Sequence, residues 1–325
     1  MRKNDESSKP KRLTKGETAE ILGIGVDVSK LSDTRGLFIS NRAILYGDSL
    51  LKSDDCDISG CVFYKCTVSN TLVASNVLLV DCDISEQESF RFNLQKNNLD
   101  KKELMGANLS QEDLTGSSLT FADLTNADLI GANLTGANLK DAYFTFADFK
   151  DANLTGANLT NAFLGGANLT GTNLTGANLT SALLKHANLT GANLTEANLS
   201  YANLTGANLT GANLTGAKFM KANLIDANLT GANLTGAHLY YATLHKANLS
   251  DANLTDANLT NANLRNTSVD KADFNNANLS GAHLSGVSLR AALNLETANL
   301  TGAVYNKSTI GLTDDQKRVM KESPV

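Results

Sequence analysis

An apolar residue recurs at every fifth position from Leu104 to Leu289, through 38 positions without a gap. The residue is Leu except at Phe144, Phe149, Phe219, Phe274 and Val269. Ala stands two residues before it almost throughout, and the exceptions are Lys102, Glu112, Ser117, Thr172, Thr267 and Val287. The consensus unit is therefore Ala-Asn-Leu-Thr-Gly.

The spacing of two between Ala and Leu is the spacing of a β-strand, so both side chains point the same way and the Asn between them points outward. Thr and Gly then interrupt the alternation, and a straight strand would send the next Ala and Leu to the opposite face. A helix is excluded because five residues rotate the Leu by about 140°, which leaves no apolar face. The pattern predicts short strand segments joined by corners, wound into a solenoid with Leu and Ala inside.

Units such as Gly206-Ala207-Asn208-Leu209-Thr210 resemble the pentapeptide-repeat family. The resemblance covers well over half of the chain and its motif is highly specific. It implies an all-β fold, a right-handed quadrilateral parallel β-helix with four units, or twenty residues, in each coil. The biochemistry of that family is less uniform than its shape.

The ends of the chain depart from the repeat. Thr14 to Glu17 and Thr313 to Gln316 both have the spacing of a capping box, which predicts a short capping helix at each end. The apolar spacing widens by one residue before Ile84, which indicates a bulge near Val80. After Leu289 the apolar register slips and continues through Leu295, Leu300, Tyr305 and Ile310. We therefore predict a disordered polar and basic arm at 1–15, an N-terminal helical cap at 16–35, irregular coils at 36–103, regular coils at 104–310 and a C-terminal capping helix at 311–325.

The charge and the cysteines narrow the function. A formal net charge of −5 predicts no direct nucleic-acid binding. No stretch has the length of a membrane span and the first residues lack the apolar segment of a signal peptide, so we expect a cytoplasmic protein. The cysteines occupy the small inward position of the repeat and are interpreted as buried thiols instead of a zinc site; they are Cys56, Cys61, Cys66 and Cys82.

If a coil holds twenty residues, positions twenty apart form columns along the solenoid. Two corner columns are almost pure Gly, whereas the other two corners and the face between them carry aromatic and basic residues, which suit a protein-contact surface. The predicted protein-binding residues are Tyr143, Phe146, Phe163, Lys185, His186, Tyr201, Lys221, Tyr241, His245, Lys246 and Arg265.

No constellation of nucleophile, base and orienting acid is found, and no phosphate or dinucleotide motif, so we expect neither an enzyme nor a cofactor. The four histidines are dispersed, which argues against a metal site. Three function classes stay open. The first is a non-enzymatic scaffold that binds a protein partner, with a homodimer through a terminus as a possible assembly. The resemblance implies two further classes. One is a DNA-mimic inhibitor of type II topoisomerase, although the strongly acidic surface of such inhibitors is lacking here. The other is a bacterial effector or regulatory adaptor.

Overall fold

The computed structural model describes residues 99–101 and 104–323, together with the backbone of seven short strands between Thr18 and Ile84. The chain divides into two units, Met1–Leu94 and Gln95–Val325. The strands of the first unit are β1 (Thr18–Ala19), β2 (Gly25–Asp27), β3 (Phe38–Ile39), β4 (Ile44–Leu51), β5 (Val62–Val68), β6 (Leu78–Val80) and β7 (Asp83–Ile84). The second contains β8 (Val304–Tyr305), α1 (Asp314–Val319) and β9 (Lys321–Glu322).

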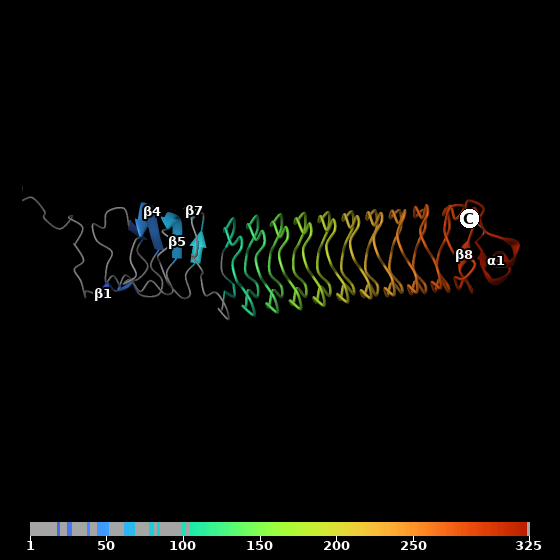
Figure 1. Cartoon of the computed structure of the whole chain (residues 1–325), viewed down its shortest axis with the longest axis horizontal. Coiled ribbons are helices and arrows are strands. Elements are labelled where there is room, and N and C mark those ends of the chain that lie inside the picture. Colours follow the sequence, from blue (N-terminus) through green and yellow to red (C-terminus); the bar gives the residue numbers. More distant parts are fainter. Residues whose placement is uncertain are drawn as a thin grey trace, which may run out of the picture. The chain divides into compact units, whose positions relative to one another are not determined.

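All strand pairs of the first unit are parallel, as in a coiled β-structure (Figure 1). Gly25 pairs with Ile44, Ile44 with Val62 and Val62 with Leu78, so successive coils have 19, 18 and 16 residues. The coils differ in length because this part lacks a strict repeat. The side chains of the four cysteines lie outside the described residues.

Two predictions for this unit need correction. β1 and β2 stand within the range 16–35 where a helix was predicted, and β1 pairs with β3. A single helical turn leaves most of its backbone groups unpaired, whereas a parallel strand bonds to the next coil. The bulge predicted near Val80 is also absent from the described strands, because β6 and β7 both pair with β5 at a separation of 16 residues. The register shifts instead lie within the pairing of β4 with β5, on both sides of Gly47.

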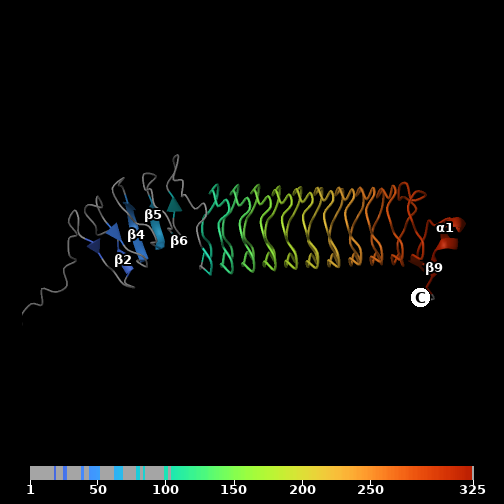
Figure 2. The same ribbon diagram turned by 90° about the horizontal axis from the view of Figure 1, so that it is seen from below.

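The second unit repeats every twenty residues. Asn188 bridges in parallel to Asn208, and Asn208 to Asn228, and the same step runs from Asn108 to Leu293. Each outward residue makes both of its backbone hydrogen bonds to the preceding coil: Asn208 donates its N–H to the Ala187 carbonyl at 2.9 Å, and its carbonyl accepts from the Leu189 N–H at 2.6 Å. Asn228 bonds in the same way to Ala207 and Leu209. The coils therefore stack in register, as Figures 1 and 2 show for the green to red part of the chain.

The bends predicted after each Leu are β-turns. The Ala212 N–H donates to the Leu209 carbonyl at 3.0 Å, and the intervening Gly211 has a φ of 64°. A positive φ at the third residue of a turn favours Gly, which explains the Gly of the consensus. Four such corners per twenty residues make the coil four-sided.

The inward Leu and Ala form one continuous core. Leu209 and its stacked neighbours Leu189 and Leu229 are all completely buried. Where Thr replaces the inward Ala, its hydroxyl is satisfied inside the core, since Thr172 Oγ1 donates to the Phe149 carbonyl at 2.8 Å. Polar residues are thus tolerated at the small inward position when a backbone acceptor is within reach.

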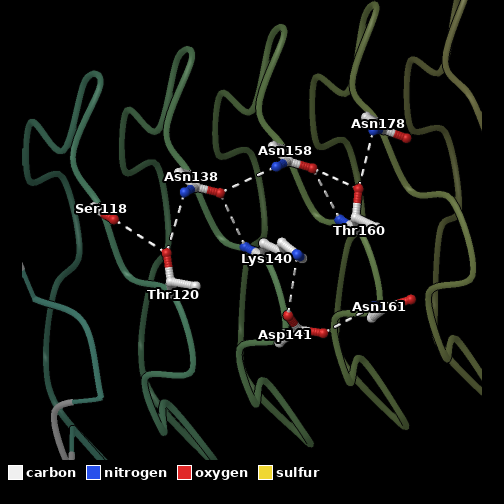
Figure 3. Close-up of polar contacts among 9 residues, drawn as sticks. All are labelled: Ser118, Thr120, Asn138, Lys140, Asp141, Asn158, Thr160, Asn161 and Asn178. Carbon is white, nitrogen blue, oxygen red and sulfur yellow. Dashed lines mark hydrogen bonds and ion pairs between the residues drawn. The ribbon is translucent and has the colours of Figure 1, made fainter.

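The outward Asn and Thr side chains form a hydrogen-bonded lattice, part of which is drawn in Figure 3. Asn158 Oδ1 accepts from the N–H of Thr160 at 3.2 Å and from its hydroxyl at 2.6 Å. Asn158 Nδ2 donates to Asn138 Oδ1 at 3.1 Å, and Asn178 Nδ2 donates to Thr160 Oγ1 at 3.0 Å, which links successive coils. The repeated Asn and Thr therefore bond mainly to one another.

The last coils lengthen before the chain ends. Asn278 pairs with Asn299 and Ser288 with Ile310, so the step grows from 20 to 21 and then 22 residues. The prediction that Tyr305 and Ile310 continue the inward column is wrong: Tyr305 is half-buried, Ile310 is exposed, and Thr309 is buried instead. The extra residue displaces the side chains from their expected positions.

The predicted C-terminal helix is present. Thr313 caps α1, since its hydroxyl accepts from the Gln316 N–H and the Gln316 side chain accepts from the Thr313 N–H. β9 then pairs with β8, and the Lys321 N–H donates to the Ala303 carbonyl at 2.7 Å. Met320 is buried, so the segment after the helix covers the last coil, whereas Val319 points into solvent.

One ionisable side chain occupies an inward position near the first regular coils. Burial, together with the adjacent Asp113 carboxylate, raises the pKa of Glu112 from the usual 4.5 to about 7. Ala132 and Ala152 hold the same place in the next coils and are fully buried or nearly so. The fold therefore tolerates Glu112 best in its protonated form.

Replacing Glu112 by Gln is expected to stabilise the protein by about 2 to 3 kcal/mol at pH 8 and to have little effect near pH 4. Below the unfolded pKa, both states carry the proton and no penalty arises. Between there and about pH 7 the unfolded state loses its proton first, so the stability of the unmodified chain falls as the pH rises. Urea unfolding at both pH values measures the difference. Glu196→Gln at an exposed corner is the control, and an equal gain from both variants would contradict the prediction.

Candidate protein-interaction face

The residues predicted to bind a protein lie on one side of the solenoid. Its edges are the corner columns at 121, 141 and onward and at 126, 146 and onward, and the strand column at 123, 143 and onward lies between them. We call these three columns, with the residues between them, the decorated face. It contains all eleven predicted residues, which are Tyr143, Phe146, Phe163, Lys185, His186, Tyr201, Lys221, Tyr241, His245, Lys246 and Arg265.

The first half of the decorated face carries an apolar column, beside Asp123 and Asp141. Tyr143 bridges to Phe163 and Phe163 to Leu183, so three large side chains follow one another in a single column. The rings of Tyr143 and Phe163 are stacked, with centroids 4.6 Å apart and an interplanar angle of 10°. Tyr143 and Leu183 are nonetheless exposed. The stack is therefore a rigid apolar ridge that presents its edge to solvent.

Two rings at the corners of the face lie over a glycine of the following coil. A Cβ on Gly166 would meet the ring of Phe146 at 2.5 Å, and one on Gly206 would meet the ring of His186 at 2.6 Å. Phe146 itself has a φ of 58°, a conformation that bulky residues rarely adopt, and its side chain is 67% exposed. The rings of Phe146 and His186 can occupy these positions because Gly166 and Gly206 have no side chain.

Gly166→Ala is expected to destabilise the protein by about 1 to 2 kcal/mol, because φ is positive and the new Cβ displaces Phe146. Gly176→Ala is the matched control, since Gly176 has almost the same φ with no atom within 4 Å of the added Cβ. It should lose about 1 kcal/mol. Urea unfolding of both variants, alone and with Phe146→Ala, isolates the ring contact, and equal losses throughout would show that the contact has no energetic role.

The second half of the decorated face is basic. The Lys221 ammonium lies 5.8 Å from the centroid of the Tyr201 ring. The Nδ1–H of His245 donates to the Arg265 carbonyl at 3.0 Å. Arg265 in turn points towards His283, with 3.4 Å between Nη2 and Nδ1. Burial and the Arg265 charge both lower the pKa of His283, so Arg265 faces a mainly neutral imidazole at pH 7.

Four cations of this half are not neutralised by any residue within 104–323. Within residues 104–323, no ion pair involves Lys185, Lys221, Lys246 or Arg265. The corner and strand columns between 181 and 286 contain only one acidic residue, Asp226. The decorated face thus carries local positive charge on a chain whose formal net charge is −5.

Several residues of this side were not among those predicted to bind a protein. Leu183 completes the apolar ridge, and Phe121 is an exposed corner residue of the same face. Tyr240 and Met220 lie just beyond the corner, where the Tyr240 hydroxyl contacts Met220 Sδ at 2.5 Å and the Tyr240 ring packs edge-on against Tyr241. Their twenty-residue spacing was the signal that could have revealed the pair.

Exposed apolar side chains concentrate on this side. Leu293, Ile310 and Val319 are exposed in the last coils and the C-terminal segment. Every other large apolar side chain that is exposed among the described residues belongs to the decorated face: Met105, Phe121, Tyr143, Phe146, Leu183, Tyr201 and Tyr241. The remaining sides consist chiefly of the Asn, Thr and Gly lattice.

Other kinds of site are not seen in the described part of the chain. There, no three His, Cys, Asp or Glu side chains gather so as to hold a metal ion. Among the same residues, no helix has the length and apolar character needed to cross a membrane.

The geometry defines a four-sided β-helical repeat protein with one chemically distinct face. The family model for pentapeptide repeats matches residues 103–141, 137–176, 177–216, 217–256 and 257–293. The chain belongs to the pentapeptide-repeat family, and its second unit is accordingly a right-handed quadrilateral β-helix. Proteins of this family are in general structural or interaction proteins and not enzymes.

The chain is similar to several solved structures, and one of them, HetL, supports the same fold. HetL, described as involved in heterocyst differentiation regulation in the cyanobacterium Nostoc sp. strain PCC 7120, is 31% identical; the match covers 67% of this chain and 94% of HetL with a TM-score of 0.57. Rfr23 from the cyanobacterium Cyanothece 51142 is 38% identical over 36% of this chain and 63% of its own, with a TM-score of 0.20. QnrB1, a plasmid-mediated fluoroquinolone resistance protein, is 18% identical over 70% of this chain and 87% of its own, with a TM-score of 0.30. No curated protein matches.

Proposed function

We propose that this protein is a non-enzymatic scaffold of the cytoplasm whose decorated face binds a protein partner. The observation that carries the proposal is the concentration of exposed aromatic residues on one side of a largely polar solenoid. The same side carries four exposed cations that have no ion pair within residues 104–323. Aromatic and Arg side chains supply large contact area at low entropic cost and dominate protein interfaces.

The rigidity of the second unit supports this role. Each coil bonds to its neighbours on every side through repeated backbone hydrogen bonds, so the spacing between face residues is fixed before a partner arrives. A surface that is already ordered loses little conformational entropy on binding. The self-bonded Asn and Thr lattice offers fewer free polar groups to compete for the partner.

The test is affinity capture followed by measurement with the purified partner. One variant replaces Tyr201, Lys221 and Tyr241 by Gly and His245 and Arg265 by Thr, which are residues of ordinary coils. A matched control changes Asp251, Asp256 and Lys271 to Gly and Asn253 to Thr, on the other sides. We expect a partner that binds the unmodified chain and the control but loses at least tenfold in affinity for the first variant, about 1.4 kcal/mol or more. Equal affinity for all three proteins would contradict the proposal.

The surface charge disfavours the DNA-mimic alternative. Five Asp residues lie in the first regular coils, and of these Asp123 and Asp141 belong to the decorated face; the other three are Asp128, Asp148 and Asp151. In later coils the decorated face is basic. A protein surface that normally binds DNA is itself basic, so it would repel this face, whereas a DNA mimic must be acidic to bind there. No observation on the described residues specifically favours the effector reading.

A further inference from the structure

We infer that the partner presents an extended acidic segment, which lies along the basic half of the decorated face with an apolar end on the ridge formed by Tyr143, Phe163 and Leu183. The inference rests on the proposed function and names the chemistry of the partner at the same site. Charge complementarity is the main argument.

The cations are arranged along the solenoid axis. Lys185 and Arg265 lie four coils apart, which corresponds to about 19 Å at the usual spacing between strands. Lys221 and Lys246 lie in the intervening coils, on opposite corners of the same face. An extended chain rises by about 3.3 Å per residue, so a segment of about six residues spans the four charges.

The described residues leave these cations available to a partner. Lys185, Lys221, Lys246 and Arg265 are all exposed. As they have no acidic partner within residues 104–323, binding an acidic segment breaks no existing ion pair. Tyr201 and Tyr241 lie between them and supply apolar contact for the stems of acidic side chains.

The apolar ridge continues the same track. Leu183 belongs to the same coil as Lys185, and Phe163 precedes it by one coil. A segment bound to the cations therefore reaches the ridge without leaving the decorated face. This polarity, acidic at one end and apolar at the other, distinguishes the expected ligand from a uniform polyanion such as a single-stranded nucleic acid.

The experiment measures the fluorescence anisotropy of two labelled peptides. Each contains six Glu residues, and two Leu residues follow them in one peptide and precede them in the other. The full chain is used at low salt. The reversal variant carries Lys185→Glu, Lys221→Glu, Lys246→Glu and Arg265→Glu. The control variant makes the same change in charge on exposed residues elsewhere, at Lys150, Lys271, Arg290 and Lys307. Circular dichroism verifies that both variants fold.

We expect the peptide to bind the unmodified chain and the control variant, to lose at least about tenfold in affinity for the reversal variant, and to bind more weakly as salt rises. Replacing the six Glu by Gln should abolish binding, and replacing the two Leu by Ser should weaken it. No binding, or equal binding to both variants, would overturn the inference. Tighter binding of oligothymidylate through the same four residues would also overturn it and assign the face to nucleic acid.

The outcome is separable from that of the proposed function. A captured protein that is lost on replacing Tyr201 and Tyr241 but retained by the reversal variant would overturn the acidic segment and leave the scaffold standing. If the peptide binds as expected but the captured partner binds both variants as tightly as the unmodified chain, the proposed function would be overturned instead.

Discussion

Leu209→Asp is expected to destabilise the protein by more than about 4 kcal/mol, because it places a carboxylate in a dry stack. Leu209 is completely buried between Leu189 and Leu229, which are equally buried. The side chain of neither neighbour can donate a hydrogen bond, and the backbone N–H groups around the site already donate to carbonyls. Urea unfolding followed by circular dichroism measures the loss.

Asn208→Asp is the control for this variant, one residue away on the outside. Asn208 Oδ1 accepts from the Thr210 N–H at 3.1 Å and hydroxyl at 2.6 Å, and a carboxylate keeps both bonds. Asp148 already occupies the equivalent place and accepts from Asn168 Nδ2 at 2.9 Å. A cost of about 1 kcal/mol or less is expected from the lost Nδ2 donor. Similar losses from both variants would refute the assignment of inside and outside.

Phe144→Ala is expected to cost about 3 to 5 kcal/mol, the second largest effect, because it opens a cavity in a core of otherwise repeated Leu. Phe144 is completely buried and packs edge-on against Phe149, with centroids 5.0 Å apart. The surrounding backbone is bonded to both neighbouring coils and cannot easily collapse into the space.

Phe144→Leu provides the comparison, since Leu124 and Leu164 fill the same column in the adjacent coils. It should cost only about 1 kcal/mol. Both variants are measured by urea unfolding, with hydrogen exchange to show whether the damage stays near the altered coil, as expected for a solenoid whose units contact only their neighbours. A loss below about 1 kcal/mol for Phe144→Ala would mean that the Phe pair is not tightly packed.

The repeating fold could be predicted from the sequence because the pattern within each five-residue unit also determines which residues meet between coils. Leu209 meets Leu229 in the next coil because each unit makes the same bend, so one unit determines the arrangement of all. The irregular parts lack this relation. The capping signal at Thr14 to Glu17 is local, whereas the pairing of β1 with β3 joins residues twenty apart and decides the structure there. At Tyr305 and Ile310, extra residues changed which side chains point inward.

The candidate face was predictable only in part. Sorting residues by columns of twenty brought Tyr143 beside Phe163 and Lys221 beside Tyr201. The same columns do not reveal that Phe146 rests over Gly166, or that Tyr240 turns towards Met220, because those contacts depend on side-chain conformation. The sequence likewise does not reveal that Lys185 and Lys246 have no ion pair within residues 104–323, because that too depends on side-chain conformation.

Because the coil has four sides, an insertion can change the side on which later residues lie without changing the stability of the solenoid. Inserting one more unit of five residues after Ala187 would leave every Leu inside and every corner intact. It would nevertheless rotate all later residues by a quarter turn, so that Tyr201 and Arg265 would open onto a different side from Tyr143. Only gains or losses of whole coils preserve the alignment. Duplication of single units can therefore lengthen such a protein without loss of the fold. Where residues of distant coils bind one partner together, however, only insertions of twenty residues keep them on the same side.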